Sequence, residues 1–125
     1  MTPGLFLLVV VAGGAGACTR YVVDALVRSR TTSAFPWPTT VINLTGSFLL
    51  GLLTGLVAGD LASTDVSAAL GTGFLGGYTT FSTASYELVQ LARQKKWGVA
   101  LAYGVGVLAV AVALAALGYR WGDSM

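Results

Sequence analysis

Residues 71–86 read GTGFLGGYTTFSTASY, and this stretch decides which fold the chain adopts. It lies within the uncharged run 66–86, which is long enough to cross the hydrocarbon core of a bilayer. The glycine pair 76–77, followed by the β-branched Thr79 and Thr80, disfavours a continuous helix. Free backbone groups at membrane depth are tolerated only where they contact an ion, water or protein. The stretch therefore predicts a broken membrane helix at the functional site.

The side chains around this predicted break suit more than one ion. Free carbonyls would suit a hard cation such as sodium. The hydroxyls are donors that would suit an anion, and the ring of Phe81 has a positively polarised edge. The hydroxyl-bearing residues at the break are Thr79, Thr80, Ser82, Thr83 and Ser85.

The rest of the chain supports a membrane protein. Hydrophobic residues make up 55% of the 125 residues, charged residues make up 10%, and the mean hydropathy is +0.78. The charges are clumped, and the uncharged runs between them match the length of membrane helices. We predict an all-α protein with one four-span domain, residues 1–125, whose third helix is broken. The predicted spans are residues 4–27, 37–59, 66–92 and 97–119.

The same composition excludes most side-chain chemistry. Four spans leave no room for a soluble enzyme domain, and no catalysis is predicted. The chain has no histidine and a single cysteine, Cys18, so imidazole bases and Cys-x-x-Cys metal sites are absent. Its basic residues flank the spans and form no stripe, which argues against nucleic-acid binding.

The basic residues are distributed unequally between the two sides of the predicted membrane domain. Five flank the loops after the first and third spans and one lies on the other side, with Arg20 left uncounted. The five are Arg28, Arg30, Arg93, Lys95 and Lys96, and the sixth is Arg120. By the positive-inside tendency, both termini of this multi-pass protein are expected outside the cytoplasm.

Polar residues within the other spans are further candidates. Arg20 either snorkels to the interface or lines an aqueous vestibule that attracts anions. Asn43 must face protein or a pore, because a free amide is costly in lipid. Tyr103 is the one polar group in the middle of the fourth span and is expected to reach a pore.

Three motifs in register resemble the Fluc fluoride-channel family. They are GGAGACTRY at 13–21, NLTGSF at 43–48 and GFLGGYTTFST at 73–83. Their order and spacing, and the total length, match over all four spans. The resemblance implies passive exit of fluoride, which confers fluoride resistance, through two pores in a dimer of antiparallel subunits. It also implies a structural sodium ion at the dimer centre, held by the backbone carbonyls of Gly76 and Thr79. The fluoride pore implied here consists of Asn43, Phe81, Thr80, Ser82, Thr83 and Tyr103, with Arg20 at the vestibule.

Two departures from the family pattern affect the predicted pore. Ala84 stands where the family has a second phenylalanine, and residues 104–116 lack the hydroxyls of the family's fourth helix. The charge asymmetry also argues against a homodimer of oppositely inserted copies. We therefore expect a heterodimer with a related subunit that supplies the missing groups, with an impaired homodimer as the alternative.

Two other functions stay open. One is a non-conducting structural subunit of such a heterodimer. The other is a small proton-coupled drug exporter, which needs a membrane-embedded carboxylate. The only acidic residues near the spans, Asp24 and Glu87, lie toward span ends, which disfavours the exporter.

Overall fold

The computed structural model describes residues 1–125, and all of its regular structure is helical. Helix α1, Pro3–Arg28, begins where the Thr2 hydroxyl accepts a hydrogen bond of 3.1 Å from the Leu5 amide. Helix α2, Trp37–Ala58, begins directly after Pro36. A proline at the start of a helix is favourable because the first amides need no helical partner. The proline-rich junction therefore separates the first two helices.

The third helical region is interrupted. It consists of α3 (Thr64–Ser67), the π-helical segment η1 (Ala68–Leu75) and α4 (Gly76–Tyr78), and it resumes as α5 (Ser82–Arg93). Thr79 has an extended backbone, with φ −78° and ψ 161°. The predicted break is thus confirmed. It lies just after the glycine pair, at the β-branched threonines, whose restricted rotamers favour extended backbone.

The last helical region is continuous. It comprises α6 (Trp97–Leu101), the π-helical segment η2 (Ala102–Gly106) and α7 (Val107–Ser124). By length and composition, three helices could cross a membrane: Pro3–Arg28, Trp37–Ala58 and Trp97–Ser124. The interrupted third region completes a small four-helix membrane protein, which confirms the predicted fold class.

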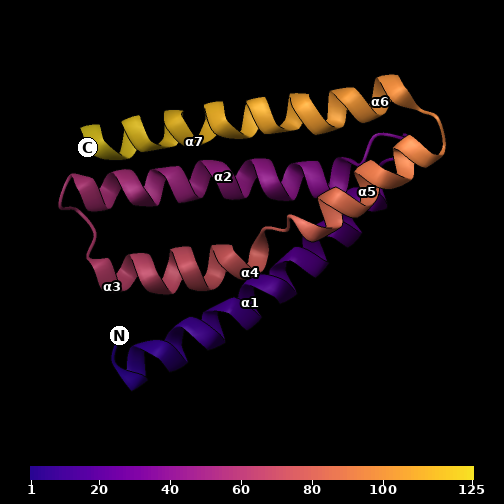
Figure 1. The fold of residues 1–125 in the computed structure, drawn as a ribbon. Helices are drawn as coiled ribbons and strands as arrows, with labels where there is room; N and C mark the ends of the chain where they lie inside the picture. The colour runs from indigo at the N-terminus through magenta and orange to yellow at the C-terminus, as the bar shows by residue number, and fades with distance from the viewer.

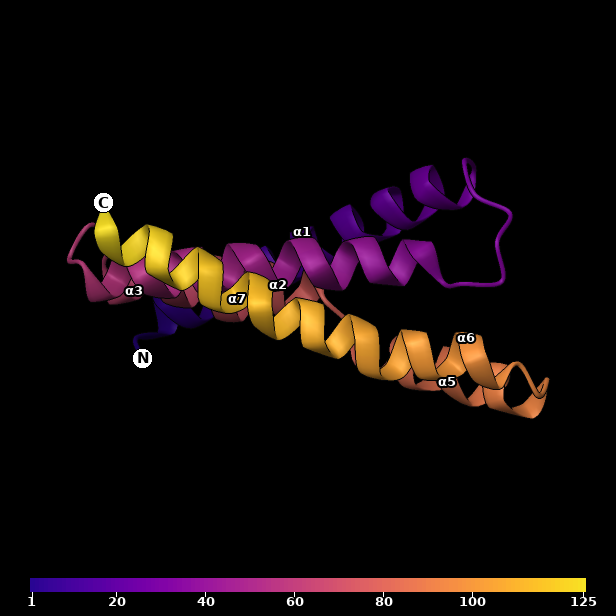
Figure 2. The same ribbon diagram turned by 90° about the horizontal axis from the view of Figure 1, so that it is seen from above.

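Helices α2 and α7 run side by side, while α1 crosses the bundle and packs against η1 and α4 (Figure 1). Both termini lie at the end of the bundle where α2 turns into α3 (Figure 1). The loops after α1 and after α5 lie at the opposite end. In the perpendicular view, α5 and α6 diverge from the α1–α2 connection at that end (Figure 2). The two basic loops therefore share one end of the molecule.

A glycine seam holds α2 against α7. A Cβ added at Gly51 or Gly55 of α2 would collide with the backbone carbonyls of Ala115 or Tyr119 in α7. On the other side of the seam, Gly118 and Gly122 leave room for the backbone of α2 in the same way. Small residues on both helices therefore allow the two backbones to touch, which is typical of membrane helix pairs.

Little of the chain is buried within one subunit. Only 20 of 125 residues are buried, and many large apolar side chains of α1, α2 and α7 are exposed. This is far more exposed apolar surface than a soluble monomer tolerates. The outer surface of the bundle is therefore suited to contact with lipid or with another subunit.

Candidate functional site

The break is held in shape by the side chain of Asn43 on α2. Its Nδ2 donates to the Thr80 carbonyl at 2.7 Å, and its Oδ1 accepts from the Thr80 amide at 2.9 Å. The amide group thus replaces the backbone partners that Thr80 would have in a continuous helix. Because Nδ2 has two hydrogens, one N–H remains for another acceptor. Asn43 therefore makes an interhelical contact and keeps a donor at the break.

The pairing with Asn43 leaves backbone carbonyls free. In a continuous helix the Thr80 amide would bond the Gly76 carbonyl, but here it donates to Asn43. The Thr79 carbonyl accepts no hydrogen bond, because the Thr83 amide donates to the Thr80 hydroxyl at 3.2 Å. No three His, Cys, Asp or Glu side chains gather at a potential metal site. A cation bound at the break would therefore depend on backbone oxygens.

A mainly apolar cavity of about 450 Å³ opens beside the break. Its walls come from α2, η1, α4, α5, η2 and α7, and the Phe81 ring at its edge is 87% exposed. A ring so exposed next to a cavity leaves this face open to lipid or to another protein surface. Eight of the residues singled out from the sequence line this cavity: Asn43, Gly76, Thr79, Thr80, Phe81, Ala84, Ser85 and Tyr103.

A buried polar cluster, which the sequence analysis did not identify, lies between α2, α5 and η2. The Thr39 hydroxyl donates to Glu87 Oε1 at 2.5 Å, and the Tyr103 hydroxyl lies 3.4 Å from the same oxygen. Thr39 is 1% exposed and Tyr103 is 4% exposed. The expectation that Glu87 lies toward a span end did not reveal that its carboxylate reaches into the bundle. The signal was present in one face of α2, on which the polar residues Thr39, Asn43 and Ser47 follow one another at intervals of four.

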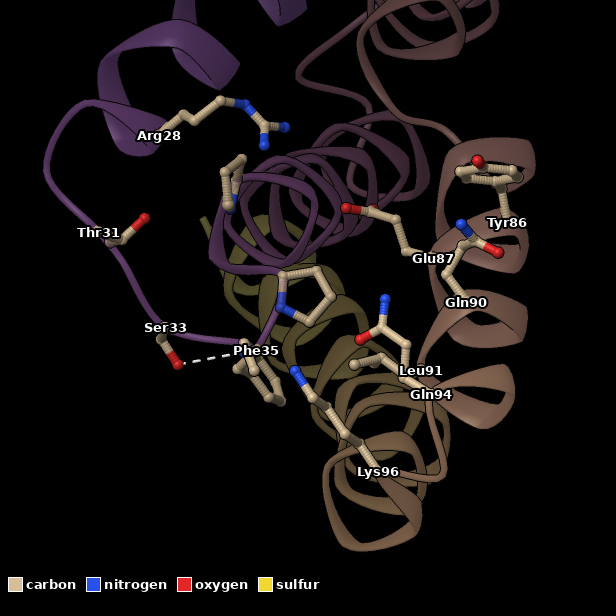
Figure 3. Close-up of a pocket in the computed structure, with 13 residues that line it drawn as sticks. Arg28, Thr31, Ser33, Phe35, Tyr86, Glu87, Gln90, Leu91, Gln94 and Lys96 are labelled. Atoms are coloured by element: carbon tan, nitrogen blue, oxygen red, sulfur yellow. Dashed lines mark hydrogen bonds between the residues drawn. The ribbon is translucent and has the colours of Figure 1, made fainter.

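A second cavity, of about 330 Å³, lies at the end of the bundle with the basic loops. Arg28 and Glu87 point toward each other across it, and Lys96 extends into it from the α5–α6 loop (Figure 3). The amides of Gln90 in α5 and of Gln94, directly after α5, also line it. This polar cavity contains several hydrogen-bond donors that could receive a small anion.

The polar cluster contributes a residue to each cavity. Glu87 lines the polar cavity, and its hydrogen-bond neighbour Tyr103 lines the apolar one. Thr80, Asn43 and Ser47 continue the line of polar groups along the apolar cavity. Polar groups therefore follow one another from the basic end of the bundle to the break.

Three predicted site residues lie outside both cavities. The side chains of Ser82 and Thr83 are exposed, and both contact Thr80: the Ser82 hydroxyl lies 3.5 Å from the Thr80 hydroxyl. Arg20 is half-buried in α1 and makes no ion pair, whereas Arg28 pairs with Asp24 at 3.1 Å. Within one subunit, the basic side chains at the polar cavity are Arg28 and Lys96.

Fold and site together define a class. This is a small multi-pass membrane protein in which an interrupted helix, clamped by an asparagine, lies against an unpartnered cavity. The family model for CrcB-like protein, Camphor Resistance (CrcB), matches residues 7–119. The chain belongs to the CrcB-like family.

Relatives that carry the name of an ion channel match almost the whole chain. It is 53% identical to Fluoride-specific ion channel FluC 1 of Leifsonia xyli, a match that covers 94% of this chain and 86% of the relative. It is 43% identical to FluC 3 of Bifidobacterium longum, over 95% of this chain and 98% of the relative. It is 41% identical to a FluC of Thermus thermophilus, over 96% of both chains.

Proposed function

We propose that this chain is a subunit of a fluoride-selective channel that lets fluoride leave the cytoplasm down its gradient. The names of its relatives support fluoride as the permeant ion. The observation that carries the proposal is the pairing of Asn43 with Thr80, which leaves Asn43 a spare N–H donor in a residue that lines the same cavity as the exposed Phe81. Fluoride is small and strongly hydrated, so a pore must replace its water with closely spaced donors. Neutral hydrogen-bond donors and aromatic ring edges replace this water without binding fluoride so tightly that it cannot leave.

The path we propose begins at the polar cavity. Its basic and amide side chains would attract fluoride to the cytoplasmic end of the bundle. The ion would then pass Tyr103, whose hydroxyl donates to Glu87 in this structure, and reach the Thr80 hydroxyl and the spare N–H of Asn43, which belong to residues lining the next cavity. Ser82 and Thr83 would join the pore only where a second subunit covers their exposed side chains.

A structural sodium ion at the break is part of the proposal. The free carbonyls of Gly76 and Thr79 are the hard oxygen ligands that sodium prefers. Both residues line the unpartnered cavity, where a second subunit would add its own carbonyls. A sodium ion there would neutralise the oxygens that the break exposes to a low-dielectric environment.

We propose an antiparallel dimer in which both termini of this chain lie outside the cytoplasm. The five basic residues at one end of the bundle favour this single orientation. A partner of opposite orientation would then be a related chain with the reverse bias. The small Ala84 and the apolar lining from Val107, Leu108 and Ala111 favour a partner that completes the pore.

Reconstitution tests this proposal. Liposomes loaded with potassium fluoride would contain the purified chain, alone or co-expressed with a related subunit of reversed Lys/Arg bias. Valinomycin would start the efflux, and a fluoride electrode would record it. We expect fast efflux from the pair and slow efflux from the lone chain. Rapid efflux from the lone chain would overturn the obligate heterodimer, and no fluoride efflux from either sample would overturn the channel.

Two alternatives have structural features in their favour. A non-conducting subunit is favoured by Ala84 and by the absence of hydroxyls on α7 facing the cavity. A proton-coupled exporter is favoured by Glu87, whose carboxylate lies inside the bundle. In a defined heterodimer, Asn43→Ala in this subunit alone would leave flux unchanged for a non-conducting subunit. Flux driven by a proton gradient would identify an exporter.

A further inference from the structure

A second contact, made by Tyr78, holds the break. The Tyr78 hydroxyl lies 3.0 Å from the Thr45 hydroxyl. Thr45 donates its own hydrogen to the Val41 carbonyl at 2.7 Å, so Tyr78 is the donor of the pair. Tyr78 is the last residue of α4, directly before the extended Thr79. The hydrogen bond therefore ties the end of α4 to α2.

The surroundings of Tyr78 leave its ring little freedom. Tyr78 is 7% exposed and belongs to a small core with Ile42 and Leu75, while its ring stacks on that of Phe74. Its hydroxyl has no hydrogen-bond partner other than Thr45. Because little water reaches this depth, losing that partner would leave a polar group unpaired in a low-dielectric region. The pair is thus both specific and costly to break.

Three nearby residues of α2 contact three successive residues at the break. Thr45 accepts from Tyr78, and Asn43 bonds both backbone groups of Thr80. Thr79 lies between Tyr78 and Thr80, and its methyl group occupies the space that Gly46 leaves free. A Cβ on Gly46 would collide with that methyl group. Helix α2 therefore serves as a template along which the interrupted chain is laid.

We propose that Thr45 and Tyr78 are a positioning pair that sets the direction of the free carbonyls of Gly76 and Thr79. The pair touches neither carbonyl and acts through the end of α4. It aligns Thr80 with Asn43 and holds the carbonyls ready for a cation. This inference rests on the proposed function only in taking the break as the ion-binding centre.

Two readouts test the pair in the full-length protein in liposomes. The first is hydrogen–deuterium exchange of peptides covering residues 76–83, which reports the protection of the Thr80 amide. The second is the sodium concentration that gives half-maximal fluoride efflux. The variants are Thr45→Val, Tyr78→Phe and their double. Thr45→Ser restores the oxygen, and Thr54→Val is the matched control because the exposed Thr54 bonds only its own helix, at Leu50.

We expect each single variant to exchange faster over 76–83 and to need about fivefold more sodium, the effect of one neutral hydrogen bond. The double variant should match the singles, because both remove one bond. Thr45→Ser and Thr54→Val should behave as the unmodified protein does. The proposed positioning pair would be overturned if the effects of the two single variants add in the double variant, if Thr54→Val has an equal effect, or if neither single variant has an effect. If the unmodified protein passes no fluoride either alone or together with the related subunit, the proposed function fails, while the exchange data still decide the pair.

Discussion

The seam between α2 and α7 and the break beside Asn43 use one helix, α2, in opposite ways. Toward its C-terminal half, glycines let α2 lie against the backbone of α7, and no side-chain hydrogen bond joins the two helices. Toward its N-terminal half, the polar side chains of Asn43 and Thr45 hold an interrupted chain. Shape complementarity is therefore enough to hold two complete helices together. A broken helix needs partners for its backbone groups.

The seam should be the more sensitive region. Gly55→Ala places a methyl group against the Tyr119 carbonyl, where backbone cannot move aside. We expect a loss of about 3 kcal/mol of stability and little correctly folded protein, despite the better helix propensity of alanine. Size-exclusion chromatography and thermal unfolding would measure this. Gly106→Ala, which meets nothing within 4 Å, is the control, and equal damage there would contradict the packing argument.

At the break, Asn43→Ala should disrupt function more than fold. It leaves the Thr80 amide and carbonyl without partners, which costs about 1–3 kcal/mol for each group that water cannot reach. We expect folded protein of reduced stability whose fluoride efflux from liposomes is lost. Ser47→Ala, on the same face of α2 and lining the same cavity, should reduce efflux less. Full efflux from Asn43→Ala would show that Asn43 is not needed for conduction.

The polar cluster should respond more mildly. Glu87→Gln keeps an oxygen for the Thr39 hydroxyl but removes the charge, so the bond weakens by about 1 kcal/mol. We expect a folded protein whose efflux rate changes severalfold. Thr39→Val removes the donor, and its effect should not add fully to that of Glu87→Gln. Thermal unfolding and efflux would be measured for the two single variants and for the double variant. Additive effects would show that Glu87 and Thr39 act independently.

The smallest effect concerns how α2 ends. Asp60 has φ 61°, and its amide and that of Leu61 bond back to Val57 and Leu56. This is a Schellman ending, in which glycine is favoured at the left-handed position. Asp60→Gly should stabilise the protein by about 1 kcal/mol, measured by thermal unfolding. Asp60→Ala, which removes the carboxylate but keeps the Cβ, should give no such gain. An equal gain in stability from Asp60→Ala would show that the loss of the charge, and not the backbone conformation, causes the effect.

Much of the fold could be predicted because bilayer thickness and backbone hydrogen bonding leave few choices. Uncharged runs of sufficient length must be helices, and the Gly-Gly-Tyr-Thr-Thr stretch could not continue as one. The exact position of the break was less certain. It depends on Asn43, which lies far away in sequence and selects Thr80 only after α2 and α4 have packed.

The candidate site was predicted in part for a similar reason. Asn43, Thr80, Phe81 and Tyr103 carry recognisable chemistry, and the structure brings all four to one cavity. The contact between Glu87 and Thr39 was not predicted because the two residues are 48 positions apart in the chain. Arg20 was selected for its charge, yet the fold places Arg28 and Lys96 at the polar cavity.

The sequence was enough to predict the membrane class, the number of helices, the interruption of the third and the shared end of the two basic loops. These follow from hydropathy, charge placement and backbone chemistry, which act locally along the chain. Only the tertiary structure decided which groups meet: Asn43 with Thr80, Thr45 with Tyr78, and Glu87 with Thr39 and Tyr103. Such contacts depend on the relative rotation and offset of packed helices, which the sequence of a single helix does not determine.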